Sequence, residues 1–148
     1  MPAHDGQVMS ELFLQGIYQH AAIRYTKALQ FCAELVDSDP AAEEKAKDLK
    51  LSLYLNSALA YIKRDQFDDA MPPCDDALKL DTTNVKALYR RATLLYQKNQ
   101  FDDAIKDLDD AGRLAPEDRA VRKLRGRVDQ EIAKQKTKEK TMAQKMFG

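Results

Sequence analysis

Three polar side chains are spaced so that they could bind an anion together: Asn56, Lys86 and Arg90. Arg90 follows Asn56 by 34 positions, which is also the period of an internal repeat, so we expect the two at the same place on neighbouring helices. Lys86 lies four residues before Arg90, one turn away on the same helical face. An amide, an ammonium and a guanidinium suit a carboxylate, which Arg can hold with two hydrogen bonds. A basic pair alone would indicate only a solvated surface, but Asn56 in phase with it favours a binding site.

Residue types that support catalysis are sparse. The two histidines, His4 and His20, have no Cys or Ser partner at a meaningful spacing, and the five glycines form no phosphate-binding loop. Four aspartate pairs recur with the repeat and are interpreted as solvated outer faces: Asp68 and Asp69, Asp75 and Asp76, Asp102 and Asp103, Asp109 and Asp110. We therefore expect no enzymatic activity, no cofactor and no metal site.

The strongest signal for the fold is the repeat itself. Residues 66–70, Gln-Phe-Asp-Asp-Ala, are identical to residues 100–104. Nine residues of one repeat have an apolar, small or identical counterpart 34 positions later: Tyr54, Ala58, Tyr61, Phe67, Asp68, Asp69, Ala70, Ala77 and Leu80. Small residues in both helices of a pair allow close approach, and a phenylalanine fills the turn between them. This period and pattern are typical of a tetratricopeptide helix–turn–helix.

We therefore predict an all-α, right-handed superhelix of three tetratricopeptide repeats followed by a long C-terminal capping helix, with seven helices in total. The chain forms one domain with five parts: an imperfect repeat one (1–35), an insertion (36–50), repeat two (51–84), repeat three (85–118), and a capping helix with a basic tail (119–148).

Within this plan the turns between paired helices are expected at Gly16–Tyr18, Asp65–Gln66 and Asn99–Gln100. The insertion is interpreted as an extension of the preceding helix, a turn at Asp37–Pro40 and a lengthened start of the next helix. The apolar stripe from Val121 to Ile132 would cover the last repeat, as a solenoid requires.

The formal net charge of zero hides two regions of opposite sign. Residues 1–118 carry 14 Lys and Arg against 21 Asp and Glu, whereas residues 119–148 carry 10 against 3. Acidic residues interrupt the basic tail, so we interpret it as a solvated helix face and expect no nucleic acid or membrane partner. No basic segment precedes an apolar one at the N-terminus, and Cys32 and Cys74 fall on apolar helix faces. Reduced, buried thiols indicate a cytoplasmic protein.

The segments Leu55–Ala58 and Lys86–Ala92 resemble the carboxylate-clamp tetratricopeptide domain of chaperone cofactors. The similarity is strongest to the C-terminal domains of large immunophilins of the cyclophilin and FK506-binding types. Small stand-alone tetratricopeptide proteins of the domain-nine type, which also end in Met-Phe-Gly, resemble the chain almost as well. The resemblance covers residues 10–148.

The resemblance implies a ligand and a set of site residues. The ligand is the C-terminal Glu-Glu-Val-Asp of heat-shock protein 90 or 70, held by Asn56, Lys86 and Arg90, with Phe13 and Lys63 lining the neighbouring groove. The chain also departs from the family, because Gly6 and Ser10 stand where repeat one should supply a Lys and an Asn.

Two alternatives stay open from the sequence. The basic tail could be an amphipathic target helix for another protein, although its first apolar residues are better explained as a cap. A degenerate clamp could bind another partner, or the incomplete first repeat could promote self-association, so we expect a monomer or a weak homodimer.

Overall fold

The computed structural model describes residues 16–21, 23–31 and 43–148 of the 148-residue chain. Residues 16–21 and 23–31 are helical, and five further helices follow: α2 (Glu43–Lys63), α3 (Phe67–Leu80), α4 (Val85–Gln97), α5 (Phe101–Leu114) and α6 (Arg119–Phe147). No β-strand occurs in these ranges, which confirms the predicted all-α class. The predicted first helix of repeat one and the turn at Asp37–Pro40 lie outside the described residues.

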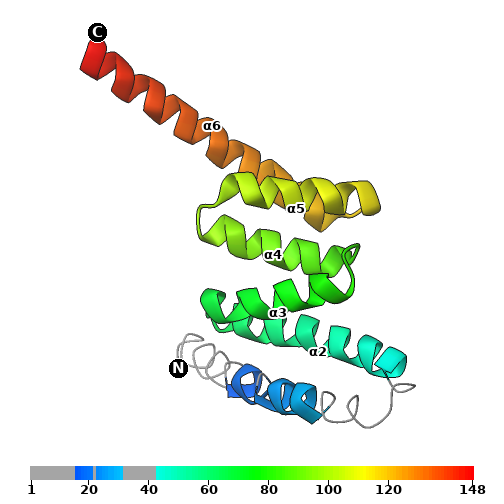
Figure 1. Ribbon diagram of the computed structural model, residues 1–148. Helices are drawn as coiled ribbons and strands as arrows, with labels where there is room; N and C mark the ends of the chain where they lie inside the picture. The colour runs from blue at the N-terminus through cyan, green and yellow to red at the C-terminus, as the bar shows by residue number, and fades with distance from the viewer. Residues whose placement is uncertain (1–15, 22, 32–42) are drawn as a thin grey trace, which may run out of the picture.

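The helices stack one after another along a single direction (Figure 1). Within each repeat the two helices pack against one another, α2 on α3 and α4 on α5, and α3 then packs on α4. The first helices of the two repeats, α2 and α4, also touch directly. This arrangement is a helical-repeat superhelix, as the repeat period predicts.

The ends of the helices repeat with the same period. Asp65 and Asn99 close the first helix of each repeat with positive φ angles of 57° and 61°. After each of them a backbone amide reaches back to the last turn, from Gln66 to the Tyr61 carbonyl oxygen at 2.9 Å and from Gln100 to that of Leu95 at 2.8 Å. Asp and Asn tolerate the left-handed conformation better than most residues. The two predicted turns are thus confirmed.

The predicted turn at Gly16–Tyr18 is wrong, because all three residues are helical. Gly16 does not take the positive φ that closes the later repeats. Glycine can adopt that conformation but also enters a helix at a modest cost, so its presence alone does not fix a turn.

The insertion lengthens α2, as predicted. This helix begins at Glu43, well before Leu51, where repeat two starts. Glu43 and Glu44 in its first turn complement the positive end of the helix dipole.

The core forms where small residues allow paired helices to approach. Ala58 and Ala92 in the first helices, and Ala70 and Ala104 in the second, are completely buried. Leu94 and Leu108 are the largest side chains among the fully buried residues. Fully burying one leucine contributes about 1.5–3 kcal/mol, so these contacts set the spacing of the helices that carry the site.

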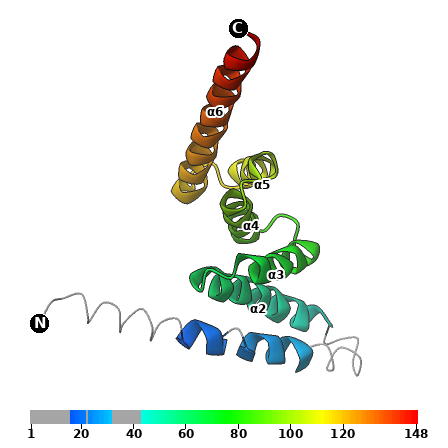
Figure 2. The same cartoon turned by 90° about the vertical axis from the view of Figure 1, so that its left-hand side faces the viewer.

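Helix α6 caps the stack and then leaves it. Val121, Leu124 and Val128 are buried against α5, and Ile132 packs at the edge of the same cluster. Beyond this point the helix projects from the body, and its apolar residues Met142, Met146 and Phe147 are exposed (Figures 1 and 2).

The outer face of α6 explains why the solenoid ends there. The positions that bury Leu88, Ala92 and Leu95 against α5 in repeat three are occupied, one period later, by Arg122, Gly126 and Asp129, all exposed. A polar outer face offers little apolar surface on which another helix could pack. Along the part of the chain described here, no helix has the length and apolar character needed to cross a membrane.

Candidate functional site

The predicted anion-binding residues lie on the two first helices that touch. Asn56 and Lys63 lie on α2, and Lys86 and Arg90 lie on α4. Asn56, Lys63 and Lys86 are exposed, whereas Arg90 is half-buried. Phe13 lies outside the described residues.

Arg90 is held in place by a backbone group of the neighbouring repeat. Its Nη1 donates a hydrogen bond of 2.6 Å to the carbonyl oxygen of Leu55, the residue before Asn56. The structure therefore brings the guanidinium of repeat three to the turn of α2 that carries the amide of repeat two. A guanidinium has five N–H donors, so most remain for a ligand. Desolvation lowers the pKa of Arg90, but an arginine remains charged at physiological pH.

Lys86 and Asn56 are available to a ligand. Across residues 16–21, 23–31 and 43–148, neither side chain forms a hydrogen bond or an ion pair, and the same holds for Lys63. Lys86 lies one turn from Arg90 on the same helix. Lys86, Lys63 and Asn56 would therefore lose few internal contacts when they bind a carboxylate.

The layer beneath the site is apolar. Cys74 of α3 is completely buried in a cluster with Ala58, Ala70 and Leu94. This burial raises the pKa of its thiol to about 12, although the nearby charge of Arg90 acts in the opposite direction. The thiol is therefore a packing group and not a nucleophile at neutral pH.

The start of α4, which carries Lys86, is fixed by a polar loop. Asn84 caps the helix by accepting a hydrogen bond of 2.9 Å from the amide of Ala87. Asp81 accepts hydrogen bonds from the amide and hydroxyl of Thr83, at 3.1 and 2.9 Å, and from the Asn84 side chain at 3.4 Å. The hydrogen bond from the Thr83 side chain is the main reason why the pKa of Asp81 is lowered.

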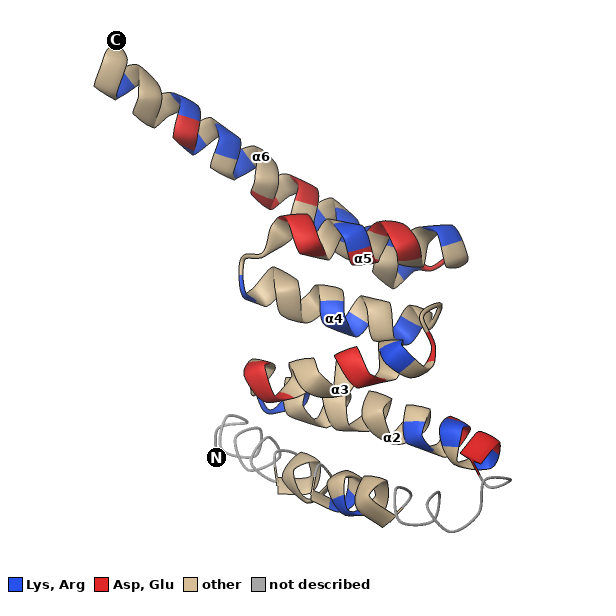
Figure 3. Cartoon of the chain, in the orientation of Figure 1, with Lys and Arg blue, Asp and Glu red and all other residues tan. Residues whose placement is uncertain are grey.

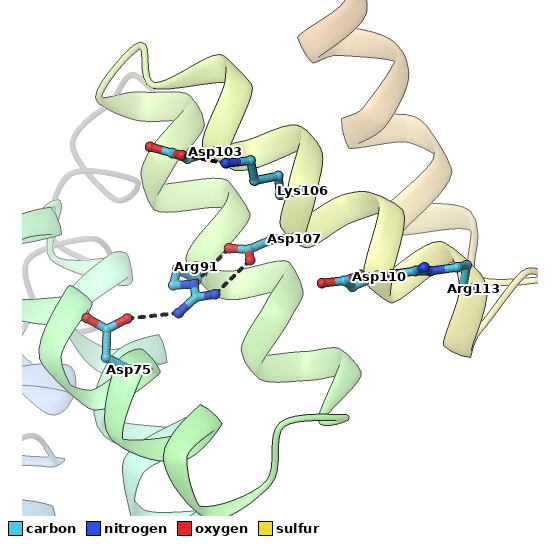
Figure 4. Close-up of polar contacts among 7 residues, drawn as sticks. All are labelled: Asp75, Arg91, Asp103, Lys106, Asp107, Asp110 and Arg113. Atoms are coloured by element: carbon cyan, nitrogen blue, oxygen red, sulfur yellow. Dashed lines mark hydrogen bonds and ion pairs between the residues drawn. The ribbon is translucent and has the colours of Figure 1, made fainter.

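The residue next to Arg90 was not predicted from the sequence to have a role. Arg91 donates two hydrogen bonds to buried Asp107 of α5, from Nε at 2.8 Å and from Nη2 at 2.7 Å, and a third from Nη1 to Asp75 of α3 at 3.2 Å (Figure 4). The bonds to Asp107 raise the pKa of Arg91 above its ordinary value.

This ion pair recurs one repeat later. Arg125 of α6 and Asp109 of α5 stand one period after Arg91 and Asp75, and Arg125 donates a 2.9 Å hydrogen bond to Asp109. Asp75 and Asp109 thus link helices, which corrects the interpretation of these aspartates as merely solvated. The arginines and the aspartates share the interval of the repeat, and this was the signal that could have revealed the pairs.

The charges of the folded chain are distributed by element. Acidic segments mark α3 and α5, basic segments lie on α4 between them, and Lys and Arg dominate along α6 (Figure 3). The cations of the candidate site therefore belong to the helix between two acidic ones.

Comparison with known proteins agrees with this fold. Residues 61–128 match the family described as Tetratricopeptide repeat. The chain is 34% identical over 138 residues to the peptidyl-prolyl cis-trans isomerase FKBP4 of Bos taurus, an alignment that covers 91% of this chain and 29% of that protein. The chain thus spans less than a third of the length of this relative.

Two solved structures illustrate the similarity in fold. The C-terminal domain of a putative FK506-binding protein of Plasmodium falciparum, PFL2275c, has a TM-score of 0.64 at 21% identity, covering 88% of this chain and 93% of the other. The first domain of Spaghetti (RPAP3), solved with the HSP90 peptide SRMEEVD, has a TM-score of 0.56 at 22% identity, covering 83% and 93%. Period, fold and family match agree, and the chain carries a tetratricopeptide-repeat domain.

Proposed function

We propose that the chain is a protein-interaction adaptor whose surface on α2 and α4 binds the acidic C-terminal peptide of heat-shock protein 90 or 70. The observation that carries this proposal is the position of the Arg90 guanidinium, which lies 2.6 Å from the carbonyl oxygen of Leu55, the residue before Asn56. Lys86 adds an unpaired ammonium one turn away. A prearranged donor loses little freedom on binding, which favours a terminal carboxylate.

The role is binding and not catalysis. A domain of this fold has been solved with an HSP90 peptide, which supports the same ligand class here. We infer a cytoplasmic location, where this chaperone peptide and a free buried thiol such as Cys74 would both occur. We also infer that the chain acts as a monomer or a weak homodimer.

The affinity should be lower than that of a complete clamp, because Gly6 and Ser10 replace a Lys and an Asn. Each lost hydrogen bond to a charged group costs about 1.5–3 kcal/mol, which corresponds to roughly ten- to a hundred-fold in affinity.

The test is a titration of a labelled peptide ending in Glu-Glu-Val-Asp, both as the free acid and with its C-terminus amidated. We expect the free acid to bind at least ten-fold more tightly, and added salt to weaken this binding because the contacts are ionic. Lys86→Ala should weaken binding of the free acid, whereas the matched control Lys79→Ala, on an exposed lysine paired only with Asp76, should not. Equal binding of the two peptides would exclude a carboxylate clamp.

A further inference from the structure

Helix α4 is held from two sides by consecutive arginines. Arg90 reaches back to α2 through the Leu55 carbonyl, and Arg91 reaches to α3 and α5 through Asp75 and Asp107. Neighbouring residues on a helix differ in direction by about 100°, so the two side chains leave α4 on different sides. Rotation of α4 about its axis would therefore break both sets of bonds.

The contact on the Arg91 side resists such a rotation. Its bond to Asp107 is two-pronged, and a planar guanidinium aligned with a carboxylate fixes direction as well as distance. Asp107 is only 5% exposed, so few water molecules compete with the arginine for its carboxylate. Figure 4 shows Arg91 between the two aspartates, with its three bonds to them drawn.

The corresponding positions in repeat two cannot form this two-pronged bond. Ser57 and Pro73 stand one period before Arg91 and Asp107, so both partners change together. On α6, Arg125 repeats the contact with Asp109, but this helix carries none of the three predicted clamp residues. The two-pronged bond therefore belongs to the one helix that carries both cations of the site.

We propose that Arg91 is a positioning residue of the carboxylate site, which sets the rotation of α4 and hence the direction of Arg90 and Lys86. The inference rests on the proposed function for its ligand. Arg91 itself bonds to protein carboxylates on both sides and does not act by touching the peptide.

The test compares two variants in the full chain. Arg91→Leu with Asp107→Leu removes the directional bond without leaving a buried charge unpaired, so the chain should still fold. Arg125→Leu is the matched control, because it removes the next arginine of the same series from a helix outside the clamp. Circular dichroism would confirm that both variants are helical.

We expect the double variant to bind the free-acid peptide at least ten-fold more weakly and the amidated peptide within two-fold of the unmodified chain. Arg125→Leu should leave both affinities within two-fold, whatever its effect on the thermal midpoint. Arg91→Lys keeps the charge but not the planar fork. We expect its affinity for the free-acid peptide to lie between those of the double variant and the unmodified chain. Unchanged binding of the free acid by the double variant, or an equal loss in Arg125→Leu, would overturn the proposal.

A second measurement needs no peptide. The bond to Leu55 should slow rotation of the Arg90 guanidinium, which nitrogen-15 exchange spectroscopy can follow. We expect this rotation to become fast in the double variant and to stay slow in Arg125→Leu. If the unmodified chain bound no peptide while Arg90 still responded, the proposed function would fail and the positioning role would stand. If Arg90 did not respond, the positioning role would fail regardless of binding.

Discussion

Arg90 of α4 donates a 2.6 Å hydrogen bond to the carbonyl oxygen of Leu55 in α2, and this bond joins the two repeats at the candidate site. Asn56, the amide of the candidate site, follows Leu55 directly in the same turn of α2. The arginine thus has a structural contact and a set of free donors at the same time.

Substituting Arg90 with lysine tests this double role. We expect Arg90→Lys to weaken binding of the free-acid peptide at least ten-fold, about 1.4 kcal/mol, because an ammonium lacks the planar fork that spans two acceptors. Fluorescence anisotropy would measure the affinity. Lys86→Arg keeps a cation at an exposed position and serves as the control. Full affinity in Arg90→Lys would show that charge alone holds the ligand.

Restoring the missing half of the clamp should strengthen binding. We expect Gly6→Lys with Ser10→Asn to raise affinity for the free-acid peptide at least ten-fold, because two polar contacts would be recovered. The same titration checks this, with the amidated peptide as the control. If affinity stayed unchanged while Lys86→Ala still weakened binding, the first helix of repeat one would not contribute to the binding surface. Light scattering would then show whether a second copy takes its place.

Much of the fold could be predicted because the same physical solution occurs twice. The alanines at the helix crossings and the Asp65 and Asn99 turns follow a fixed period, so each occurrence supports the other. The turn predicted at Gly16 was wrong because glycine permits a turn without requiring one. Arg91 was missed for another reason. Its two-pronged partner Asp107 has no counterpart in repeat two, where Pro73 stands, so the repeat period gives a signal for the bond to Asp75 but none for the bond to Asp107.

Ser57 is a buried polar residue with an energetic cost. Within the described ranges its hydroxyl oxygen is buried and has no hydrogen-bond partner. We expect Ser57→Ala to raise the free energy of unfolding by about 1 kcal/mol, because an unsatisfied polar group is removed. Urea denaturation followed by circular dichroism would measure it. Ser52→Ala, at an exposed position of the same helix, should change little, and a loss of stability in Ser57→Ala would contradict the prediction.

Asp81 should make stability depend on pH in acid. Its pKa is lowered from 3.8 mainly by the Thr83 side chain, so the folded state favours the carboxylate. Such a group stabilises the fold above its unfolded pKa, and this contribution is lost as pH falls below about 3.8 through the lowered folded value. We expect the thermal midpoint of Asp81→Asn to lie below that of the unmodified chain at pH 7, and this difference to be smaller at pH 2.5. Glu117→Gln, an exposed neighbour of α6, is the control, and a constant difference at both pH values would refute the assignment.

Cys74 should be unreactive while the chain is folded. Burial raises the pKa of its thiol from 9.0 to about 12, so little thiolate is present at pH 8. In a Cys32→Ser background, we expect Ellman's reagent to label native protein far more slowly than protein in urea. Fast labelling of the native chain would mean that α2 and α4, which supply Ala58 and Leu94 to its cluster, do not cover the thiol.

Pro72 and Pro73 inside α3 should determine which part of the repeat array unfolds first. Neither proline has an amide hydrogen, so the carbonyls of Asp68 and Asp69 receive no helical hydrogen bond from them. The stability of a repeat array is approximately the sum of its units and their interfaces, and here the α2–α3 unit lacks the arginine–aspartate fork of the next unit. Unfolding should therefore start at α3 and spread from there, while α4 to α6 hold longest. A peptide bound to both α2 and α4 would contact the unit that opens first and the unit that holds longest. Its binding should therefore slow the opening of the α2–α3 unit.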